Sequence, residues 1–230
     1  MTIIAAICDG QHAVIASDSD GSTEFYSEDH GSKVFEVAPG LVAGAAGSCI
    51  VGAWCRRHLR GLLADESGVV PLDPEHLRPR IEDAWDAYRR HLHERSQRSP
   101  IIDLKCDSLV LATAVAIYIA QADGSVVLTQ HYAARGSGVE LAMGSLYTTL
   151  VALGWDDIEG AARVAVETCL RHSPSCGGSV HVARVGPPLP SPDVVSDPPG
   201  KPIMYIDDSA GWTVVHTTGD EPPSSWKDSE

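Results

Sequence analysis

The second residue of the chain has the chemistry of a nucleophile that carries its own base. A strand-forming run, Ile3 to Ile7, follows Thr2 directly, whereas most domains leave their first residues loose and polar. Methionine aminopeptidase accepts a small second residue, so removal of Met1 would leave a hydroxyl and a free α-amine on Thr2. A hydroxyl needs a base within hydrogen-bond reach. An α-amine, with an ordinary pKa of about 7.7–8.0, can serve as that base near neutral pH.

Three further parts are needed around such a nucleophile: a cation to lower the pKa of the amine, a carboxylate to orient the cation, and backbone N–H groups to receive an oxyanion. Asp18 closes the second apolar run, which a hairpin at 9–11 folds beside the first. Lys33 opens the next strand after a polar loop. Gly44, in VAGAAG, lies where a strand gives way to a helix, and we expect free N–H groups there. The sequence therefore offers a candidate for each part.

These stretches resemble the proteasome β-type subunits and the related two-tier bacterial ring peptidase, which belong to the N-terminal nucleophile (Ntn) hydrolase superfamily. The spacing from Thr2 to Asp18 equals the spacing in that family, and Lys33 is offset by about one residue. The resemblance covers about residues 2–185. The matching stretches, in family order, are TIIAAI, IASDSDG, SKVFEV, VAGAAG, RGSGVELAMGSL and CGGSVHVARV.

The resemblance implies a threonine-type endopeptidase that acts on unfolded protein or peptide without a cofactor or a metal. It also implies self-association into a ring and admits an ATPase unfoldase as a partner. Two residues depart from the family pattern, because Ser173 and Cys176 stand where the family often has an Asp and a Ser. The roles it implies are Thr2 as nucleophile, Asp18 and Lys33 as charged partners, Gly44 as oxyanion donor helped by Gly47, and Ser137 as a hydroxyl near the α-amine.

Composition excludes several other classes of function. The chain has 230 residues, with 17 basic and 31 acidic side chains and a net charge of -14. This balance argues against a surface that binds nucleic acid or an anionic membrane, because proteins that bind either one usually carry a basic patch. No apolar run approaches the ~20 residues that cross a bilayer, and no signal peptide is evident. The six cysteines form no CxxC pair, so we expect reduced thiols in a cytoplasmic protein rather than a zinc site.

The pattern of apolar runs predicts an α+β fold with two antiparallel sheets between pairs of helices, and the resemblance implies a four-layer αββα sandwich. We expect one domain over 1–218, which includes a proline-rich loop at 186–202 and a last hairpin from PIMYIDD and WTVVHTT. A disordered acidic tail, 219–230, would follow. The expected elements are strands at 2–8 and 12–17, a loop at 18–32, two strands in 33–47, helices at about 48–64 and 74–98, a hairpin of 108–120 with 125–133, helices at 138–153 and 156–171, and a strand at 178–185.

Two other interpretations use the same residues. Gly136-x-Gly138 follows a strand and opens a helix, as in a turn that binds a dinucleotide phosphate. That fingerprint needs a parallel strand afterwards, whereas a second helix begins near Asp156 here. The third interpretation is a ring component that keeps the fold for assembly and has no catalytic threonine. Retention of Met1 or an unreactive Thr2 would be its mark.

Overall fold

The computed structural model describes residues 2–22, 27–29, 32–98 and 107–186. Contacts between Cα atoms group residues 1–187 into one compact unit. The expected hairpin of PIMYIDD with WTVVHTT, the acidic tail and all but the first residue of the proline-rich loop lie outside the described residues.

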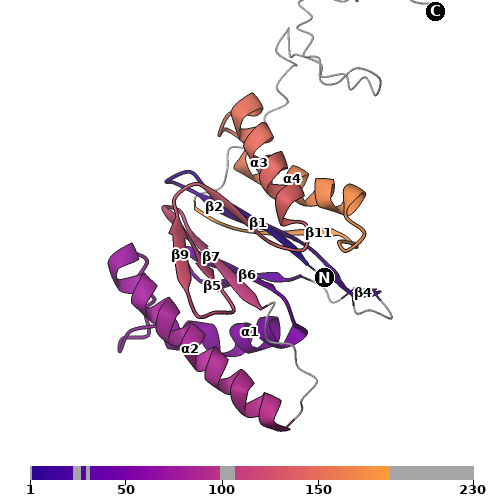
Figure 1. Ribbon diagram of the computed structural model, residues 1–230. Coiled ribbons are helices and arrows are strands. Elements are labelled where there is room, and N and C mark those ends of the chain that lie inside the picture. The colour runs from indigo at the N-terminus through magenta and orange to yellow at the C-terminus, as the bar shows by residue number, and fades with distance from the viewer. Residues whose placement is uncertain (1, 23–26, 30–31, 99–106, 187–230) are drawn as a thin grey trace, which may run out of the picture. The chain divides into compact units, whose positions relative to one another are not determined.

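Two stacked antiparallel sheets form the centre of this unit, and a pair of helices covers the outer face of each (Figure 1). The arrangement is the predicted α+β sandwich. The first sheet has the order β10 (Tyr132–Gly136), β1 (Ile3–Cys8), β2 (Ala13–Asp18), β11 (Val180–Val185), and the second has the order β5 (Val34–Ala38), β6 (Leu41–Ala46), β7 (Ser108–Thr113), β8 (Ala116–Ala120), β9 (Val126–Thr129). The helices are α1 (Cys49–Leu63) and α2 (Pro74–Arg98) on the second sheet, and α3 (Val139–Leu153) and α4 (Ile158–His172) on the first.

The first strand is buried on both faces, which explains why the chain begins with an unbroken apolar run. Successive side chains of a strand point to opposite faces. Ile4 and Ala6 accordingly pack between the two sheets, while Ile3, Ala5 and Ile7 pack against α3 and α4. All six residues of β1 have no exposed surface, so burial fixes the register of this strand.

An apolar stripe on α2 packs this helix against the second sheet. Its members repeat at helical spacing and all are buried against the second sheet, which confirms that the stripe is core. Asp73 caps this helix, because its Oδ1 accepts the His76 N–H over 3.1 Å. The stripe consists of Leu77, Ile81, Trp85, Tyr88 and Leu92.

The segments predicted as one long hairpin, 108–120 with 125–133, are four strands. The first breaks at residues 114–115, where Thr113 Oγ1 accepts the Ala116 N–H over 3.2 Å and closes a tight turn. The second breaks at residues 130–131, where the chain leaves the second sheet and β10 joins β1 in the first. Only the β8–β9 turn at Asp123-Gly124 is as expected.

The predicted loop at 18–32 holds two short paired strands, β3 (Asp20–Ser22) and β4 (Ser27–Asp29). Ser48 precedes α1 as expected, but its side chain does not cap the helix. Its hydroxyl donates to Asp107 Oδ2 over 3.1 Å, and its N–H donates to Asp107 Oδ1 over 2.7 Å, so the buried carboxylate orients Ser48.

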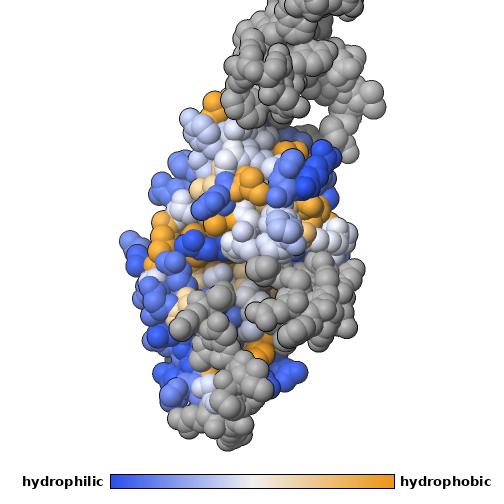
Figure 2. Space-filling model, turned by 45° about the vertical axis from the view of Figure 1, so that its right-hand side comes forward, coloured by the Kyte–Doolittle hydropathy of each residue, from blue (hydrophilic) through white to orange (hydrophobic). Residues whose placement is uncertain are grey.

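The surface over α3 and α4 carries several large hydrophobic side chains that no described residue covers. α3 is apolar around most of its circumference, which is typical of a helix with partners on more than one side. Figure 2 shows hydrophobic residues interspersed with hydrophilic ones on the face that it presents. The exposed hydrophobic residues of this region are Leu141, Tyr147, Val151, Trp155 and Val164. No helix among the described residues is long and apolar enough to span a bilayer.

Candidate active site

Thr2 lies at the start of β1, and the end of β10 holds its carbonyl in place. The Ser137 N–H donates to the Thr2 carbonyl oxygen over 2.9 Å, and the Ser137 hydroxyl lies 3.4 Å from the same oxygen. Thr2 is 7% exposed. Strand alternation puts it on the same face as Ile4, toward the second sheet. Ser137 therefore contacts Thr2 through the carbonyl oxygen, whereas the expected role placed its hydroxyl near the α-amine.

Gly136 makes this close approach possible. It pairs with Ile3 across β1 and β10 and has a φ of +118°. A Cβ at this position would lie 1.8 Å from the Thr2 carbonyl oxygen. Only glycine combines that backbone conformation with that contact.

Asp18 collects three donors at the end of β2. Its Oδ1 accepts the Ile3 N–H over 3.0 Å and lies 2.7 Å from Lys33 Nζ. Its Oδ2 faces the Gly177 N–H at 3.5 Å. The Asp18 side chain has no exposed surface, and a buried carboxylate is stable only with such partners. One oxygen thus joins the cation to the peptide that follows Thr2.

Lys33 reaches Asp18 from the second sheet. It precedes β5, and its carbonyl oxygen accepts the Ala45 N–H over 3.2 Å. The Lys33 side chain is 12% exposed. This ion pair therefore stands largely out of solvent, where a charge influences a neighbouring group far more than it does in water. The structure thus joins Lys33 and Asp18, and it joins Asp18 to the N–H of Ile3, the residue after Thr2.

The two glycines expected to supply an oxyanion donor have different environments. Gly44 lies inside β6, opposite Val34 of β5 and Val110 of β7. Because the Ala45 N–H points to β5, the alternation of an antiparallel ladder turns the Gly44 N–H toward β7. The role of Gly44 as an oxyanion donor stays a prediction, and the register points its N–H toward β7.

Gly47 follows the last residue of β6 and is exposed. Its φ of +117° again favours glycine. By the same alternation its N–H points to the side of Ala45 N–H, where Lys33 lies. Among the described residues no acceptor is recorded for this N–H. Gly47 is therefore the better candidate for the oxyanion donor.

The two residues that depart from the family pattern lie in the turn between α4 and β11. Cys176 is buried, and its Sγ lies 3.9 Å from the Ser137 hydroxyl. Ser173 ends α4, and its hydroxyl lies 2.8 Å from that of Ser175. Within the described residues this is the recorded side-chain partner of Ser173, so Cys176 approaches the site more closely.

The dinucleotide interpretation of Gly136-x-Gly138 does not fit this geometry. The Ser137 N–H already donates to the Thr2 carbonyl oxygen. α3 is followed by α4 rather than by a parallel strand, and every strand pair among the described residues is antiparallel. No three His, Cys, Asp or Glu side chains in the described part of the chain are arranged to hold a metal ion.

Sequence reasoning did not assign three parts of this site. The Ile3 and Gly177 N–H groups are backbone donors, so residue types could not reveal them. Gly136 was placed in a matching stretch and in a possible phosphate-binding turn but was given no role at Thr2, because its contact with Thr2 depends on the pairing of β1 with β10. Cys169 lies on the buried face of α4, which its helical spacing would have indicated.

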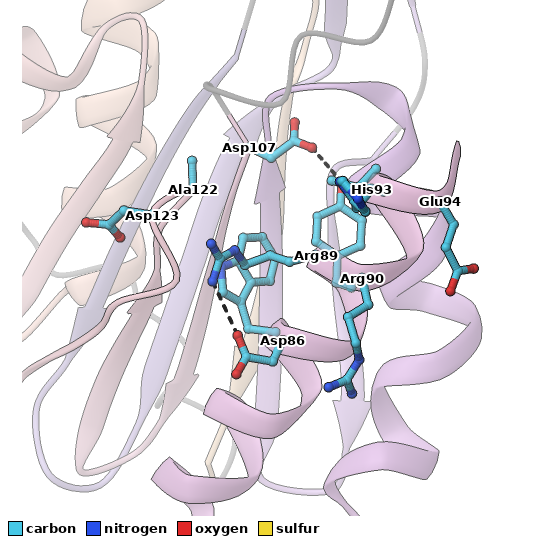
Figure 3. Close-up of a pocket in the computed structure, with 11 residues that line it drawn as sticks. Asp86, Arg89, Arg90, His93, Glu94, Asp107, Ala122 and Asp123 are labelled. Atoms are coloured by element: carbon cyan, nitrogen blue, oxygen red, sulfur yellow. Dashed lines mark hydrogen bonds and ion pairs between the residues drawn. The ribbon is translucent and has the colours of Figure 1, made fainter. Parts of the chain in front are cut away.

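A cavity of about 860 Å³ lies along α2, in a different layer from Thr2 (Figure 3). Two pairs of its lining polar groups contact each other. Tyr88 donates to Asp107 Oδ2 over 2.5 Å, and Arg89 lies 3.4 Å from Asp86. The candidate site therefore rests on the Thr2 cluster and not on this cavity.

No protein-family model matches the chain, and no curated protein matches it. Solved structures do match. BPH from Thiobacillus denitrificans, in complex with epoxomicin, is 19% identical with a TM-score of 0.62, and the match covers 83% of this chain and 100% of that chain. A second structure of this BPH is 21% identical with a TM-score of 0.61 and the same coverage. HslV from Trypanosoma brucei is 17% identical with a TM-score of 0.62, over 80% of this chain and 99% of that chain.

The chain has the proteasome-like Ntn-hydrolase fold. The predicted resemblance is thus confirmed at the level of the fold, and so is the αββα sandwich. These neighbours are matched over nearly their whole length, so the complete Ntn sandwich lies within the matched part of this chain.

Proposed function

We propose that this chain is a threonine-type peptidase in which Thr2, after removal of Met1, attacks peptide bonds with its own α-amine as the base. The observation that carries the proposal is the contact of Lys33 Nζ with Asp18 Oδ1 at 2.7 Å, on the same carboxylate oxygen that accepts the Ile3 N–H. A cation and a carboxylate are thereby held beside the residue that would become the N-terminus. The fold shared with BPH and HslV supports the same proposal.

The chemistry follows from these positions. The ammonium group of Lys33 disfavours a second positive charge nearby, so it lowers the pKa of the Thr2 α-amine and keeps the amine neutral near pH 7. The amine takes the proton of the Thr2 hydroxyl as its oxygen attacks the substrate carbonyl carbon. The Gly47 N–H receives the developing oxyanion. The proton passes from the amine to the leaving amine, and water then hydrolyses the ester on Thr2.

Asp18 acts in this scheme by fixing Lys33. The carboxylate is fully buried and holds donors from β1, from Lys33 and from the turn before β11. It therefore determines where the cation stands relative to Thr2. Ser137 fixes the Thr2 carbonyl, so the backbone of the nucleophile is held from both sides. Ser173 carries no charge, and Lys33 with Asp18 would have to supply the electrostatic tuning.

We also propose that the chain assembles into a ring of its own copies. The exposed hydrophobic side chains of α3 and α4 form a surface that self-association would cover. A ring would shelter the Thr2 sites from folded proteins. Unfolded protein or peptide is the substrate that fits such a chamber, and an ATPase unfoldase is the partner that would supply it. The cytoplasm is the location that fits free thiols.

The alternative is a ring subunit without catalysis. It is favoured by the replacement of an acidic residue by Ser173 and of a hydroxyl by Cys176 near the site. In that case Met1 would stay in place, or Thr2 would become the N-terminal residue and still be unreactive.

Intact-mass spectrometry of the purified protein separates the two proposals. We expect the mass to lack Met1, and to increase by one equivalent of epoxomicin, the compound present in one BPH structure, with the adduct mapped to Thr2. The Thr2→Ala variant is the matched control and should stay unlabelled. A protein that retains Met1, or that loses Met1 and remains unlabelled on Thr2, would support the non-catalytic subunit.

A further inference from the structure

Two cysteine thiols lie together beside the segment that holds Thr2. Cys169, on the buried face of α4, donates its S–H to the Gly138 carbonyl oxygen over 3.2 Å. Cys176, in the turn after α4, has its Sγ 3.9 Å from the Ser137 hydroxyl. Both thiols are free, and each contacts one residue of the Ser137–Gly138 pair.

The missing side chain of Gly138 leaves the space that the two sulfur atoms share. A Cβ on Gly138 would lie 2.9 Å from Cys169 Sγ and 3.3 Å from Cys176 Sγ. Both sulfur atoms therefore lie against Gly138 on the side where another residue would carry its side chain. The chain between them turns back on itself at Ser173, whose N–H donates to the Cys169 carbonyl and whose carbonyl accepts the Cys176 N–H. This turn keeps the two thiols on the same side of α4.

We propose that Cys169 and Cys176 form a reversible intramolecular disulfide on exposure to a peroxide, and that this bond switches off Thr2. The first half concerns the thiols alone, while the second half rests on the proposed function. A disulfide needs two sulfur atoms that can approach to about 2.05 Å with their Cβ atoms about 3.5–4.5 Å apart. Because both sulfur atoms lie close to the same position beside Gly138, the approach that a disulfide requires can come from rotation of the two cysteine side chains.

The chemistry assigns a different step to each thiol. Cys176 is 9% exposed and Cys169 is fully buried, so a small oxidant meets Cys176 first. The Cys176 sulfur attacks hydrogen peroxide, breaks its O–O bond and becomes a sulfenic acid, with release of one water. Cys169 then attacks the sulfenic sulfur and expels a second water. The pair loses two protons and two electrons, and peroxide is reduced to two waters.

The order of these steps agrees with the environment of Cys169. Burial first, then the neighbouring Cys176 and Asp18, raise the pKa of the Cys169 thiol to about 12. A thiol with so high a pKa is a poor attacking group toward free peroxide. Its attack on a sulfenic acid at Cys176 is intramolecular. The high effective concentration of the thiol then compensates for its low reactivity.

The disulfide would change two contacts beside the Thr2 support. Cys169 loses its S–H hydrogen, so its bond to the Gly138 carbonyl cannot persist, and the Cys176 sulfur must move relative to the Ser137 hydroxyl when it bonds to Cys169. Ser137 positions the Thr2 carbonyl through its N–H. A shift of about 1 Å in a positioning segment can cost about 100-fold in rate. We expect a loss of that order in peptidase activity, with full recovery on reduction.

The bond itself is tested without any assay of activity. Trypsin cleaves after Arg163, Arg171 and Arg184, so the thiols fall on two separate peptides, VAVETCLR and HSPSCGGSVHVAR. After treatment of the wild-type protein with hydrogen peroxide, we expect these peptides to be joined in the non-reduced digest and separate after dithiothreitol. Recovery of Cys176 as sulfinic acid with Cys169 still alkylatable, or of either thiol linked to another chain, would overturn the proposal.

The switch is tested by comparing variants, each normalised to its own reduced rate. Cys169→Ser keeps a donor for the Gly138 carbonyl and should lose the reversible inactivation. Cys55→Ser removes another buried thiol, on α1, and should respond like the wild type. Joined peptides with unchanged epoxomicin labelling of Thr2 would refute the switch. If neither oxidised nor reduced protein is labelled, the proposed function fails while the peptide map still decides the disulfide.

Discussion

The Gly136 backbone runs against the Thr2 carbonyl so closely that a single methyl group would not fit between them. A Cβ on Gly136 would lie 1.8 Å from that oxygen, and the next N–H, that of Ser137, donates to it over 2.9 Å. Thr2, which directly precedes β1, is therefore placed by a segment 134 positions later in the chain. These two contacts fix the position of the Thr2 backbone.

We predict that Gly136→Ala abolishes measurable peptidase activity. The added Cβ must push the Thr2 carbonyl away, and a φ of +118° is unfavourable for alanine. Strain of this kind costs about 1–3 kcal/mol of stability, and displacement of the nucleophile costs about 100-fold or more in rate. Turnover of a fluorogenic peptide and the urea midpoint measure the two effects.

Gly144→Ala is the matched control for this prediction. Gly144 lies within α3, and a Cβ there would meet open space. Alanine should stabilise the helix by about 0.8–1 kcal/mol and leave the rate unchanged. If Gly136→Ala is as active as Gly144→Ala, the clamp on Thr2 has no part in catalysis.

Thr2→Ala should remove turnover and leave the fold and the assembly intact. The hydroxyl of a residue at the start of a strand contributes little to packing, whereas it is the attacking group in the proposed mechanism. Thr2→Ser keeps a hydroxyl and should retain part of the activity. Peptide hydrolysis by Thr2→Ala at the wild-type rate would make Thr2 a structural residue only. Size-exclusion chromatography with light scattering checks that all three proteins form the same oligomer.

Asp107 should act on the rate through Ser48, the neighbour of Gly47. Its Oδ1 accepts the Ser48 N–H over 2.7 Å, and its Oδ2 accepts the hydroxyls of Ser48 and Tyr88. Asp107→Ala leaves these buried donors without their acceptor and frees the backbone that presents Gly47. We expect stability to fall by about 1–3 kcal/mol and kcat to fall by about tenfold with little change in KM.

Asp107→Asn separates positioning from folding in this network. Asparagine keeps an acceptor for the Ser48 N–H, so it should restore most of kcat even if part of the stability is still missing. A kcat of Asp107→Ala that equals the wild-type value, measured on folded protein, would remove Asp107 and Ser48 from the catalytic scheme.

The sequence could predict what depends on neighbouring residues. The hairpin that brings Asp18 beside Ile3, the residue after Thr2, closes at Asp9-Gly10-Gln11, so the spacing along the chain almost determines this contact. The stripe on α2 was likewise visible because helical periodicity reports burial directly. The paired helices and antiparallel sheets followed from the order of such local patterns.

What escaped prediction depends on register and on distant partners. The choice between Gly44 and Gly47 as oxyanion donor depends on the direction of an N–H group, and that direction depends on which β6 residue faces Lys33. Ser48 turned from its helix to Asp107, 59 positions away, and no local pattern encodes that choice. The strand break after Thr113 likewise rests on a side-chain turn within an apolar run.

The last prediction concerns Lys33 and Asp18 as a coupled pair. Removal of the ammonium in Lys33→Ala raises the pKa of the Thr2 α-amine, so a higher pH is needed to free the base. The rate near pH 7 should fall by orders of magnitude, and the acid limb of the pH–rate profile should move to higher pH. Asp18→Asn removes the charge that holds Lys33 in place and should be nearly as harmful. The double variant should be little worse than either single one, because residues that act as a unit give non-additive losses.

The free energy of unfolding must be measured for each variant, so that a loss of rate is not confused with a loss of folded protein. Breaking a buried ion pair by removal of one partner costs about 3–5 kcal/mol, and Asp18 is fully buried 2.7 Å from Lys33 Nζ. Rates must therefore be compared at a temperature where every variant is folded. Ser173→Asp completes the series: if Ser173 stands where an acid belongs, this variant should be tolerated and should raise the rate. Effects of Lys33→Ala and Asp18→Asn that simply multiply, with an unshifted pH profile, would exclude the pair from the mechanism even with Thr2 confirmed as the nucleophile.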